Sequence, residues 1–291
     1  MAAPTRGART GRLELADIVR AHGAAFRARH RLRSVQHRAL TAIERCRTAA
    51  LGGELRACDV CGERRYVYHS CRNRHCPKCQ SLAKEHWLAD RRAELLPVPY
   101  YHLVFTLPHE LNALAQGNPS ALYAMLFAAA SQTLVEFGEN PRWLGGDIAA
   151  TLVLHTWGQT LSQHLHVHAL VAAGALSEAG AWIRALRGFL FPVKALSVVF
   201  RGKFLDTLGA ALARGRLALS GSTAALGEPC AQQRLLAVLH AKPWIVYAKR
   251  PFAGPEAVLD YLGRYTHRTA ISNERLVSLD ASTERWPHPS R

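Results

Sequence analysis

Three histidines spaced two residues apart, His164, His166 and His168, are the first candidates for chemistry in this sequence. They lie in an apolar run, 161–172, that has the character of a buried strand. Side chains alternate between the two faces of a strand, so the three imidazoles are expected to point the same way. Imidazoles aligned on one face of a core strand are suited to bind a metal ion. The alternative is that they are ordinary core histidines satisfied by hydrogen bonds.

Two tyrosines, Tyr261 and Tyr265, lie four residues apart in a segment, 258–266, that is expected to be helical. This spacing places both phenols on one helix face, about 5–6 Å apart at Cβ. Arg264 and Arg268 lie beside them and would stabilise both a phenolate and a phosphate. A phenol of ordinary pKa, about 10, becomes a nucleophile at neutral pH only when a metal polarises the group it attacks. The alternative is an amphipathic helix that uses tyrosine for core contacts.

Together these groups suggest a DNA strand transfer. A metal held by His166 and His168 would polarise the scissile phosphate, and a tyrosine would attack the phosphorus. The expected products are a 5′-phosphotyrosine link and a free 3′-hydroxyl, with no requirement for ATP because the bond energy is retained. Two neutral imidazoles plus phosphate oxygens suit Mg²⁺ or Mn²⁺, and the pattern leaves that choice open.

The cysteines form a second candidate site. Two Cys-x-x-Cys pairs predict a structural Zn²⁺ site whose ligands are Cys58, Cys61, Cys76 and Cys79. Cys71 and His75 would replace a ligand or build a second site, whereas Cys46 and Cys230 receive no role. Four thiolates leave no open position, so this zinc is expected to fold its segment rather than to catalyse. The basic rim predicted to bind DNA consists of Arg64, Arg65, Arg72, Arg74 and Lys78.

Hydrophobic periodicity and turn residues give the elements that would position these groups. Helices are expected over 13–47, 81–96, 120–137, 193–214, 231–240 and 258–266. Strands are expected over 100–107, 148–155, 164–173, 182–184, 244–248 and 275–279. Strands separated by long helices predict an α+β fold with a central antiparallel sheet flanked by helices. The expected domains are a disordered basic arm (1–12), a helical and zinc-binding DNA-binding domain (13–97), a catalytic domain (98–279) and a tail (280–291).

The formal net charge of +16 is concentrated in the first 100 residues, which carry 20 Lys and Arg against 9 Asp and Glu. Arginine dominates that excess, which predicts a polyanionic partner such as nucleic acid. The alternatives are a charge that serves solubility and a coding bias towards arginine. Because no apolar run reaches 18 residues without a charge or a breaker, no membrane span is expected. Clustered cysteines at metal-ligand spacing indicate a reducing compartment, so we expect a cytoplasmic protein.

Several further motifs occur in order along the chain. They are CRTAALG at 46–52, SCRNRHCPKC at 70–79, VFTLPHE at 104–110, HTWG at 155–158, HLHVH at 164–168, FRGKF at 200–204, YLGRYTHR at 261–268 and AISN at 270–273. On these motifs the sequence resembles the rolling-circle transposases of the insertion sequence ninety-one family, the two-tyrosine branch of the HUH endonucleases. The resemblance extends from about residue 13 to about residue 279.

The resemblance implies a zinc-binding N-terminal domain and an HUH catalytic domain that nicks and rejoins single-stranded DNA at the ends of a mobile element. The partners would be single-stranded element ends and target DNA, on the nucleoid of a bacterial cytoplasm. His166 and His168 match the HUH motif, and Tyr261 and Tyr265 match the two nucleophiles. The candidates for the third metal ligand are His164, His155 and His267.

The segment 281–291 does not resemble the continuation of the family, so we expect a catalytic domain shortened at its C-terminus. Two other functions stay open. The first is a non-catalytic zinc protein that binds the DNA of its own element as a regulator. The second is a metal-dependent nuclease in which the histidines activate water and no tyrosine takes part. A relaxase or a replication initiator would share the HUH chemistry, but the zinc module and the motif order favour a transposase.

Overall fold

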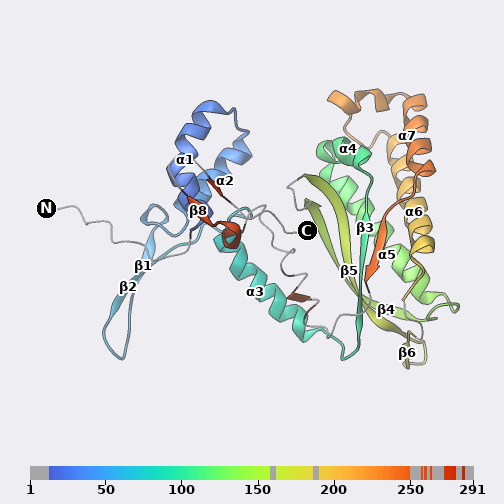
Figure 1. Ribbon diagram of the computed structural model, residues 1–291, viewed down its shortest axis with the longest axis horizontal. Helices are drawn as coiled ribbons and strands as arrows, with labels where there is room; N and C mark the ends of the chain where they lie inside the picture. Colours follow the sequence, from blue (N-terminus) through green and yellow to red (C-terminus); the bar gives the residue numbers. More distant parts are fainter. Residues whose placement is uncertain are drawn as a thin grey trace. The chain divides into compact units, whose positions relative to one another are not determined.

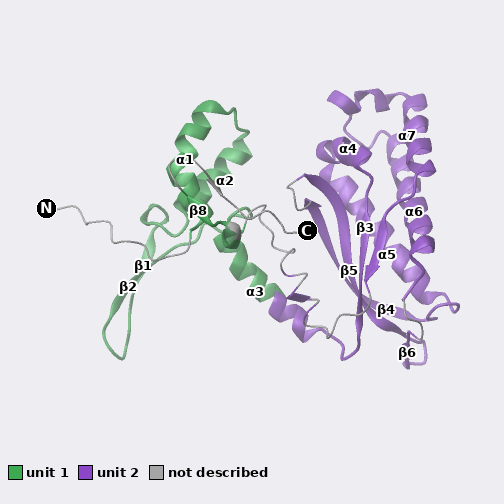
Figure 2. Cartoon of the chain, viewed as in Figure 1, with its two compact units in different colours: residues 1–87, 267–291 green, residues 88–266 purple. Residues whose placement is uncertain are grey.

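The computed structural model describes residues 13–157, 162–185, 190–249, 257, 259–260, 263, 272–279 and 284–285 (Figure 1). The chain divides into two compact units, and the boundary between residues 87 and 88 falls inside a helix (Figure 2). Unit 1 comprises residues 1–87 and 267–291, and unit 2 comprises residues 88–266.

Unit 1 combines short helices with an exposed β-hairpin. Its elements are α1 (Leu15–Arg29), α2 (Ser34–Arg45), η1 (Ala49–Leu51), β1 (Gly53–Ala57), β2 (Arg64–Tyr68), α3 (Pro77–Ala93), η4 (Asn273–Arg275), β8 (Ser278–Leu279) and β9 (Glu284–Arg285). A small core joins Ala16 and Val19 of α1 to Ile43 of α2 and to two cysteines, Cys46 and Cys76. The segment 13–47, which was expected to be helical, forms two helices, α1 and α2. The chain breaks between α1 and α2 and doubles back, because only then do the apolar residues of α1 pack on those of α2.

The β1–β2 hairpin was not expected. All of its residues are exposed, so neither strand carries the alternation of apolar and polar residues that marks a half-buried strand. The expected strand over 275–279 is mostly wrong as well. The 3-10 turn η4 ends at Arg275, and only Ser278–Leu279 is a strand, paired with Glu284–Arg285.

Unit 2 is built on an antiparallel sheet with the order β4-β5-β3-β7, and β6 pairs with β5. The strands are β3 (Tyr100–Thr106), β4 (Asp147–Trp157), β5 (Gln163–Leu176), β6 (Trp182–Arg184) and β7 (Val246–Lys249). The helical elements are η2 (His109–Leu111), α4 (Asn112–Gly117), α5 (Pro119–Glu139), α6 (Val193–Ala213), η3 (Gly221–Gly227) and α7 (Pro229–Ala241). The expected mixed fold with an antiparallel sheet is confirmed. Most of the helix expected over 258–266 lies outside the described residues.

The core of unit 2 lies between the sheet and the helices α5 and α6 (Figure 1). Leu165 and Val167 of β5 belong to this core and are fully buried with Leu126 of α5 and Phe200 of α6. Since neighbouring side chains on a strand point to opposite faces, the histidines that alternate with Leu165 and Val167 lie on the other face of β5. The packing of α5 and α6 thus decides which face of the sheet carries the histidines.

One described helix, α5, is long and apolar enough to cross a membrane by length and composition alone. Half of its most apolar window is buried inside unit 2, as in the core helix of a globular domain. The helix is therefore weak evidence for a membrane span.

Candidate metal centres

Three buried histidines lie close together on the face of the sheet opposite the α5 and α6 helices. His166 and His168 come from β5, and His155 comes from β4, where it pairs directly with His166 in the sheet register. One ring nitrogen from each residue lies within 4.8 Å of those of the other two. The three residues are between 5% and 8% exposed, so the two strands bring their imidazoles together in a region shielded from water.

Hydrogen bonds orient two of these rings. The Nδ1 of His166 lies 2.9 Å from the carbonyl oxygen of His164. A carbonyl only accepts, so Nδ1 of His166 must carry the proton, and Nε2 carries the lone pair that a metal needs. The Nδ1 of His168 lies 2.7 Å from Nε2 of His102, a buried residue of β3 whose ring stacks on that of His168. His102 thus holds the orientation of His168, and when it accepts from Nδ1, Nε2 of His168 is left as the ligand atom.

Burial keeps the imidazoles of His102 and His168 neutral. Burial, together with the charges that His155, His166 and His102 would carry, lowers the pKa of His168 from 6.5 to about 2. Burial and the neighbouring charge of Lys249 lower the pKa of His102 to about 4. A neutral imidazole is the form that binds metals, so these residues do not have to lose a proton before a cation enters at neutral pH. Three such donors fit a divalent cation with further coordination positions open to oxygen ligands.

The sequence-based expectation and the structure differ on the third histidine. The structure brings His166 and His168 together, but the residue beside them is His155 and not His164. His164 is exposed. Its backbone carbonyl oxygen lies against Nδ1 of His166 and its ring centroid lies 4.8 Å from that of His166, but its ring is not among the three clustered imidazoles. His267, the other alternative, lies outside the described residues, as do the predicted nucleophiles Tyr261 and Tyr265 and the flanking residues Arg264 and Arg268.

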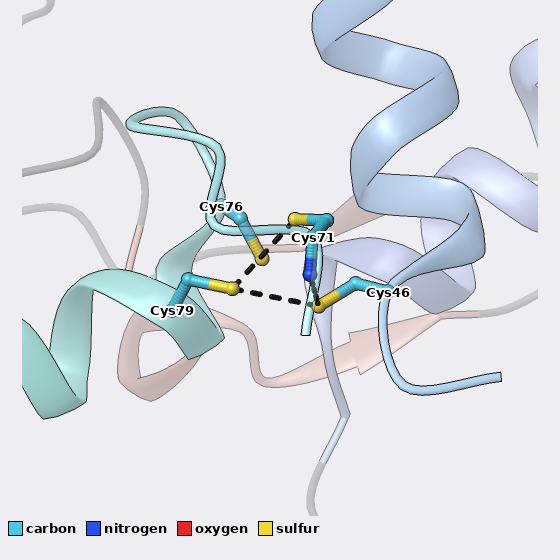
Figure 3. Close-up of side chains that lie close together, drawn as sticks. All are labelled: Cys46, Cys71, Cys76 and Cys79. Atoms are coloured by element: carbon cyan, nitrogen blue, oxygen red, sulfur yellow. Dashed lines mark hydrogen bonds between the residues drawn. The ribbon is translucent and has the colours of Figure 1, made fainter. Parts of the chain in front are cut away.

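Four cysteines cluster in unit 1 at the start of α3 (Figure 3). The Sγ of Cys79 lies 3.6 Å from the Sγ of Cys46 and 3.6 Å from the Sγ of Cys71. The backbone N–H of Cys71 donates to the Sγ of Cys46 at 3.5 Å, and Cys76 completes the group. All four sulfurs lie within 4.8 Å of one another, which is the arrangement of a tetrahedral Cys₄ zinc site.

The surroundings of the cysteines change how readily each thiol ionises. Burial raises the pKa of Cys76 to about 11 and raises that of Cys71 as well. For Cys79, burial opposes ionisation, but hydrogen bonds from Cys46, Cys71 and Cys76 outweigh it and lower the pKa. In the metal-free cluster Cys79 is therefore easier to ionise than Cys71 and Cys76. A bound Zn²⁺ would hold all four as thiolates and join α2 to α3.

This cluster is not the set of ligands expected from sequence. Cys58 and Cys61 lie in the turn between β1 and β2, where both are exposed and outside the cluster. In that turn Gly62 adopts a φ of 70°, a conformation that glycine adopts readily. The backbone N–H groups of Cys61 and Val60 donate to Cys58 and lower its pKa. His75 is exposed and also lies outside the cluster. Cys46, which received no role, takes part because α2 returns to α3, a contact that Cys-x-x-Cys spacing does not reveal.

The predicted basic rim is spread over the surface of unit 1. Arg64 and Arg65 lie on the exposed strand β2, and Arg74 is exposed ahead of α3. Arg72 is exposed and adopts an unusual backbone conformation. The ammonium of Lys78 lies 2.6 Å from the carboxylate of Glu14, so its charge is partly compensated within the unit. Their roles in DNA binding stay predictions.

Comparison with known families identifies both parts of the chain. Residues 18–107 match a transposase zinc-binding domain, and residues 149–286 match a family described as putative transposase. The chain is 51% identical over 275 residues to the putative transposase y4qJ of Sinorhizobium fredii, covering 94% of this chain and 69% of that protein. It is 30% identical over 249 residues to the transposase for insertion sequence element IS801 of Pseudomonas savastanoi pv. phaseolicola. That match covers 84% of this chain and 58% of the relative.

Solved structures offer a weaker likeness. TrwC complexed with a 27-mer DNA that comprises the recognition hairpin and the cleavage site superposes with a TM-score of 0.29 and 13% identity. The likeness covers 56% of this chain and 71% of that one. At this score and identity it supports no conclusion about function.

Proposed function

The chain belongs to the insertion sequence ninety-one family of transposases, and we propose that it nicks and rejoins single-stranded DNA at the ends of its element through a tyrosine nucleophile. The observation that carries the proposal is the convergence of His155, His166 and His168 on one shielded face of the sheet. A cluster of three buried imidazoles in a transposase has a ready use, because a divalent cation bound there would polarise a phosphate and stabilise the charge that develops on it.

The residues of the chain have separate tasks in this proposal. His155, His166 and His168 hold the cation, and His102 keeps the ring of His168 in place. The hydroxyl oxygen of Tyr261 or Tyr265 attacks the phosphorus, and the bond from phosphorus to the 3′ oxygen breaks. The departing 3′ oxygen takes up a proton, and the 5′ phosphate stays esterified to the tyrosine. Reversal with another 3′-hydroxyl rejoins the strand without ATP, because the phosphodiester energy is kept in the phosphotyrosine.

The candidates for the cation are Mg²⁺ and Mn²⁺. Mg²⁺ prefers ligand sets made of oxygen, whereas Mn²⁺ accepts imidazole more readily. Three histidines therefore favour Mn²⁺ as the ion with which to begin an assay. The zinc-binding unit has a different role in the proposal, since four thiolates would leave no position for a reacting phosphate. Its task is to hold DNA next to the catalytic unit.

A covalent-adduct assay tests the proposal. The full chain with Mn²⁺ is mixed with a 3′-labelled single-stranded oligonucleotide that carries the end of the element, and the products are separated on a denaturing gel. The proposal expects a metal-dependent band of protein linked to labelled DNA that persists in each single Tyr→Phe variant and disappears in Tyr261→Phe/Tyr265→Phe. Cleavage that leaves a free 5′-phosphate and no adduct would instead indicate a nuclease that uses water. DNA binding without cleavage would indicate a regulator.

A further inference from the structure

A cavity of about 380 Å³ lies in unit 1 beside the cysteine cluster, apart from the histidine site of unit 2. Its lining includes Arg47, which follows α2, and Arg72, which follows β2. The remaining polar groups of its wall come from Ser70 and from Gln80 and His86 of α3, and Leu82 adds apolar surface. The volume is in the range of cavities that bind small ligands, and a nucleotide unit would fit.

The two arginines share a rare backbone conformation. Arg47 has a φ of 54° and Arg72 a φ of 50°, and among the described residues no other residue besides glycine has a positive φ. This conformation costs energy for residues with a Cβ and is adopted most readily by glycine. Each arginine directly follows a cysteine of the cluster, and the N–H of Arg72 hydrogen-bonds the sulfur of Cys79. The cluster thus accounts for the backbone geometry at Arg72, whereas the N–H of Arg47 donates to the carbonyl oxygen of His69 at 3.1 Å.

The cluster does not account for the arginine side chains. Glycine would give the same left-handed turns and the same backbone N–H bonds with less strain, so the choice of arginine at both positions needs a second reason. Both arginines line the same cavity. Strained residues that persist at two places around one cavity point to a function of that cavity.

The charges of the wall indicate which ligand the cavity would take. Its lining includes two arginines, a histidine, a serine and a glutamine, and none of its described lining residues is an aspartate or a glutamate. Neither Arg47 nor Arg72 forms an ion pair with any carboxylate in the described part of the chain. Guanidinium groups bind phosphate through paired N–H donors. Leu82, which is 55% exposed, offers an apolar surface for a sugar or a base.

We propose that this cavity binds a nucleotide of single-stranded DNA, with Arg47 and Arg72 on its phosphate. The proposal rests on the proposed function, because it takes DNA as the partner of unit 1. A concave site suits a strand whose nucleotides are free to turn outwards, whereas a duplex keeps its bases stacked inside. The cavity would hold the strand by its backbone, without choosing a sequence.

The test uses glycine, because glycine removes the side chain and suits the backbone. Arg47→Gly/Arg72→Gly is compared with the full wild-type chain and with Arg31→Ala/Arg38→Ala, a control pair of exposed arginines that do not line the cavity. Binding of a fluorescein-labelled dT20 is followed by anisotropy at several salt concentrations, with zinc retained and no Mg²⁺ or Mn²⁺ added. Zinc content and melting temperature are measured for each variant.

The proposal expects the glycine pair to keep its zinc and its melting temperature and to bind dT20 at least tenfold more weakly, because each hydrogen bond to a charged group is worth about tenfold or more. The slope of log K against log salt should fall by about 0.7, since the two arginines share one phosphate and each phosphate contact to a single strand contributes about 0.7. The control pair should change affinity by less than threefold. Inorganic phosphate should compete no better than chloride of equal ionic strength.

Three results would overturn the proposal. One is a folded glycine pair that binds dT20 like the wild type. Another is an equal loss in the glycine and control pairs, which would show that only net charge matters. The third is selective competition by inorganic phosphate, which would make the cavity a site for the free anion. If the glycine pair loses zinc, Arg47→Asn/Arg72→Asn replaces it, because asparagine also tolerates this backbone.

The two proposals fail separately. A chain that binds dT20 through Arg47 and Arg72 but never forms a covalent adduct would overturn the strand-transfer proposal and leave the cavity proposal standing. If the wild type forms the adduct but the glycine pair binds dT20 normally, the cavity proposal is overturned and the strand-transfer proposal stands.

Discussion

Replacing His102 should weaken metal binding in unit 2, although His102 is not among the three clustered histidines. The Nε2 of His102 lies 2.7 Å from the Nδ1 of His168, and both rings are buried and stacked at an interplanar angle of 4°. For Nε2 of His168 to bind a cation, its Nδ1 must carry the proton and donate it to His102. His102→Phe keeps a flat ring of similar size in the stack and removes that acceptor.

The expected size of the effect follows from the role of such outer hydrogen bonds. Loss of a partner that orients a metal ligand costs about 10–100-fold in metal affinity, or about 1.4–2.7 kcal/mol. We expect the lower part of this range if His168 finds another acceptor and the upper part if its N–H stays unpaired in the buried site. His102→Gln should recover part of the affinity, because its amide oxygen offers an acceptor near the position of the imidazole Nε2.

Titration calorimetry of metal-free protein with Mn²⁺ measures this effect without a nucleic acid or a cleavage reaction. His164→Ala is the matched control, since His164 also lies on β5 but is exposed and touches His166 through its backbone carbonyl. We expect wild-type affinity for this control. Wild-type affinity in a folded His102→Phe protein would refute the positioning role. Equal losses in the Phe and Gln variants would refute the hydrogen-bond mechanism and leave only packing.

Three further predictions concern the metal sites. His155→Ala should abolish Mn²⁺ binding in the same titration while His164→Ala keeps it, and the opposite order would restore His164 as the third ligand. Cys46→Ser should lower the zinc content, measured by atomic emission, and destabilise unit 1, whereas Cys58→Ser should leave the zinc of this cluster in place. Equal zinc loss in both variants would contradict the grouping. Because His168 stays neutral in the folded protein down to a pH of about 2 but takes up a proton near 6.5 when unfolded, metal-free unit 2 should lose stability as the pH falls below 6.5. His168 alone contributes a slope of about 1.4 kcal/mol per pH unit in urea unfolding, and His102, whose pKa is lowered to about 4, adds a similar slope above that pH. A flat profile between about pH 6.5 and 5 would contradict the burial of neutral imidazoles.

The sequence alone predicted the orientation of side chains where all the residues concerned lie on one strand. The alternation of His166 and His168 with core residues of β5 predicted which way the imidazoles point, because strand periodicity is local. The third histidine was not predictable in this way. His155 reaches the site through the pairing of β4 with β5, and pairing register depends on contacts between distant segments.

The zinc-binding unit illustrates the same limit. The Cys-x-x-Cys spacing predicted a local pair, Cys76 and Cys79, but the grouping with Cys46 depends on α2 folding back towards α3. The hydrophobic pattern did not predict the β1–β2 hairpin, because every residue of both strands is exposed. What could be predicted was the chemistry of each segment, and what could not was which segments meet.

The most direct test of the strand-transfer account is mass spectrometry of the protein–DNA adduct. Wild-type protein is incubated with Mn²⁺ and single-stranded element-end DNA, digested with protease and nuclease, and searched for a peptide that carries a nucleotide. The account predicts a 5′-nucleotide esterified to Tyr261 or Tyr265, and no adduct when His155, His166 and His168 are replaced by alanine. Cleaved DNA with a free 5′-phosphate and no modified peptide would contradict it.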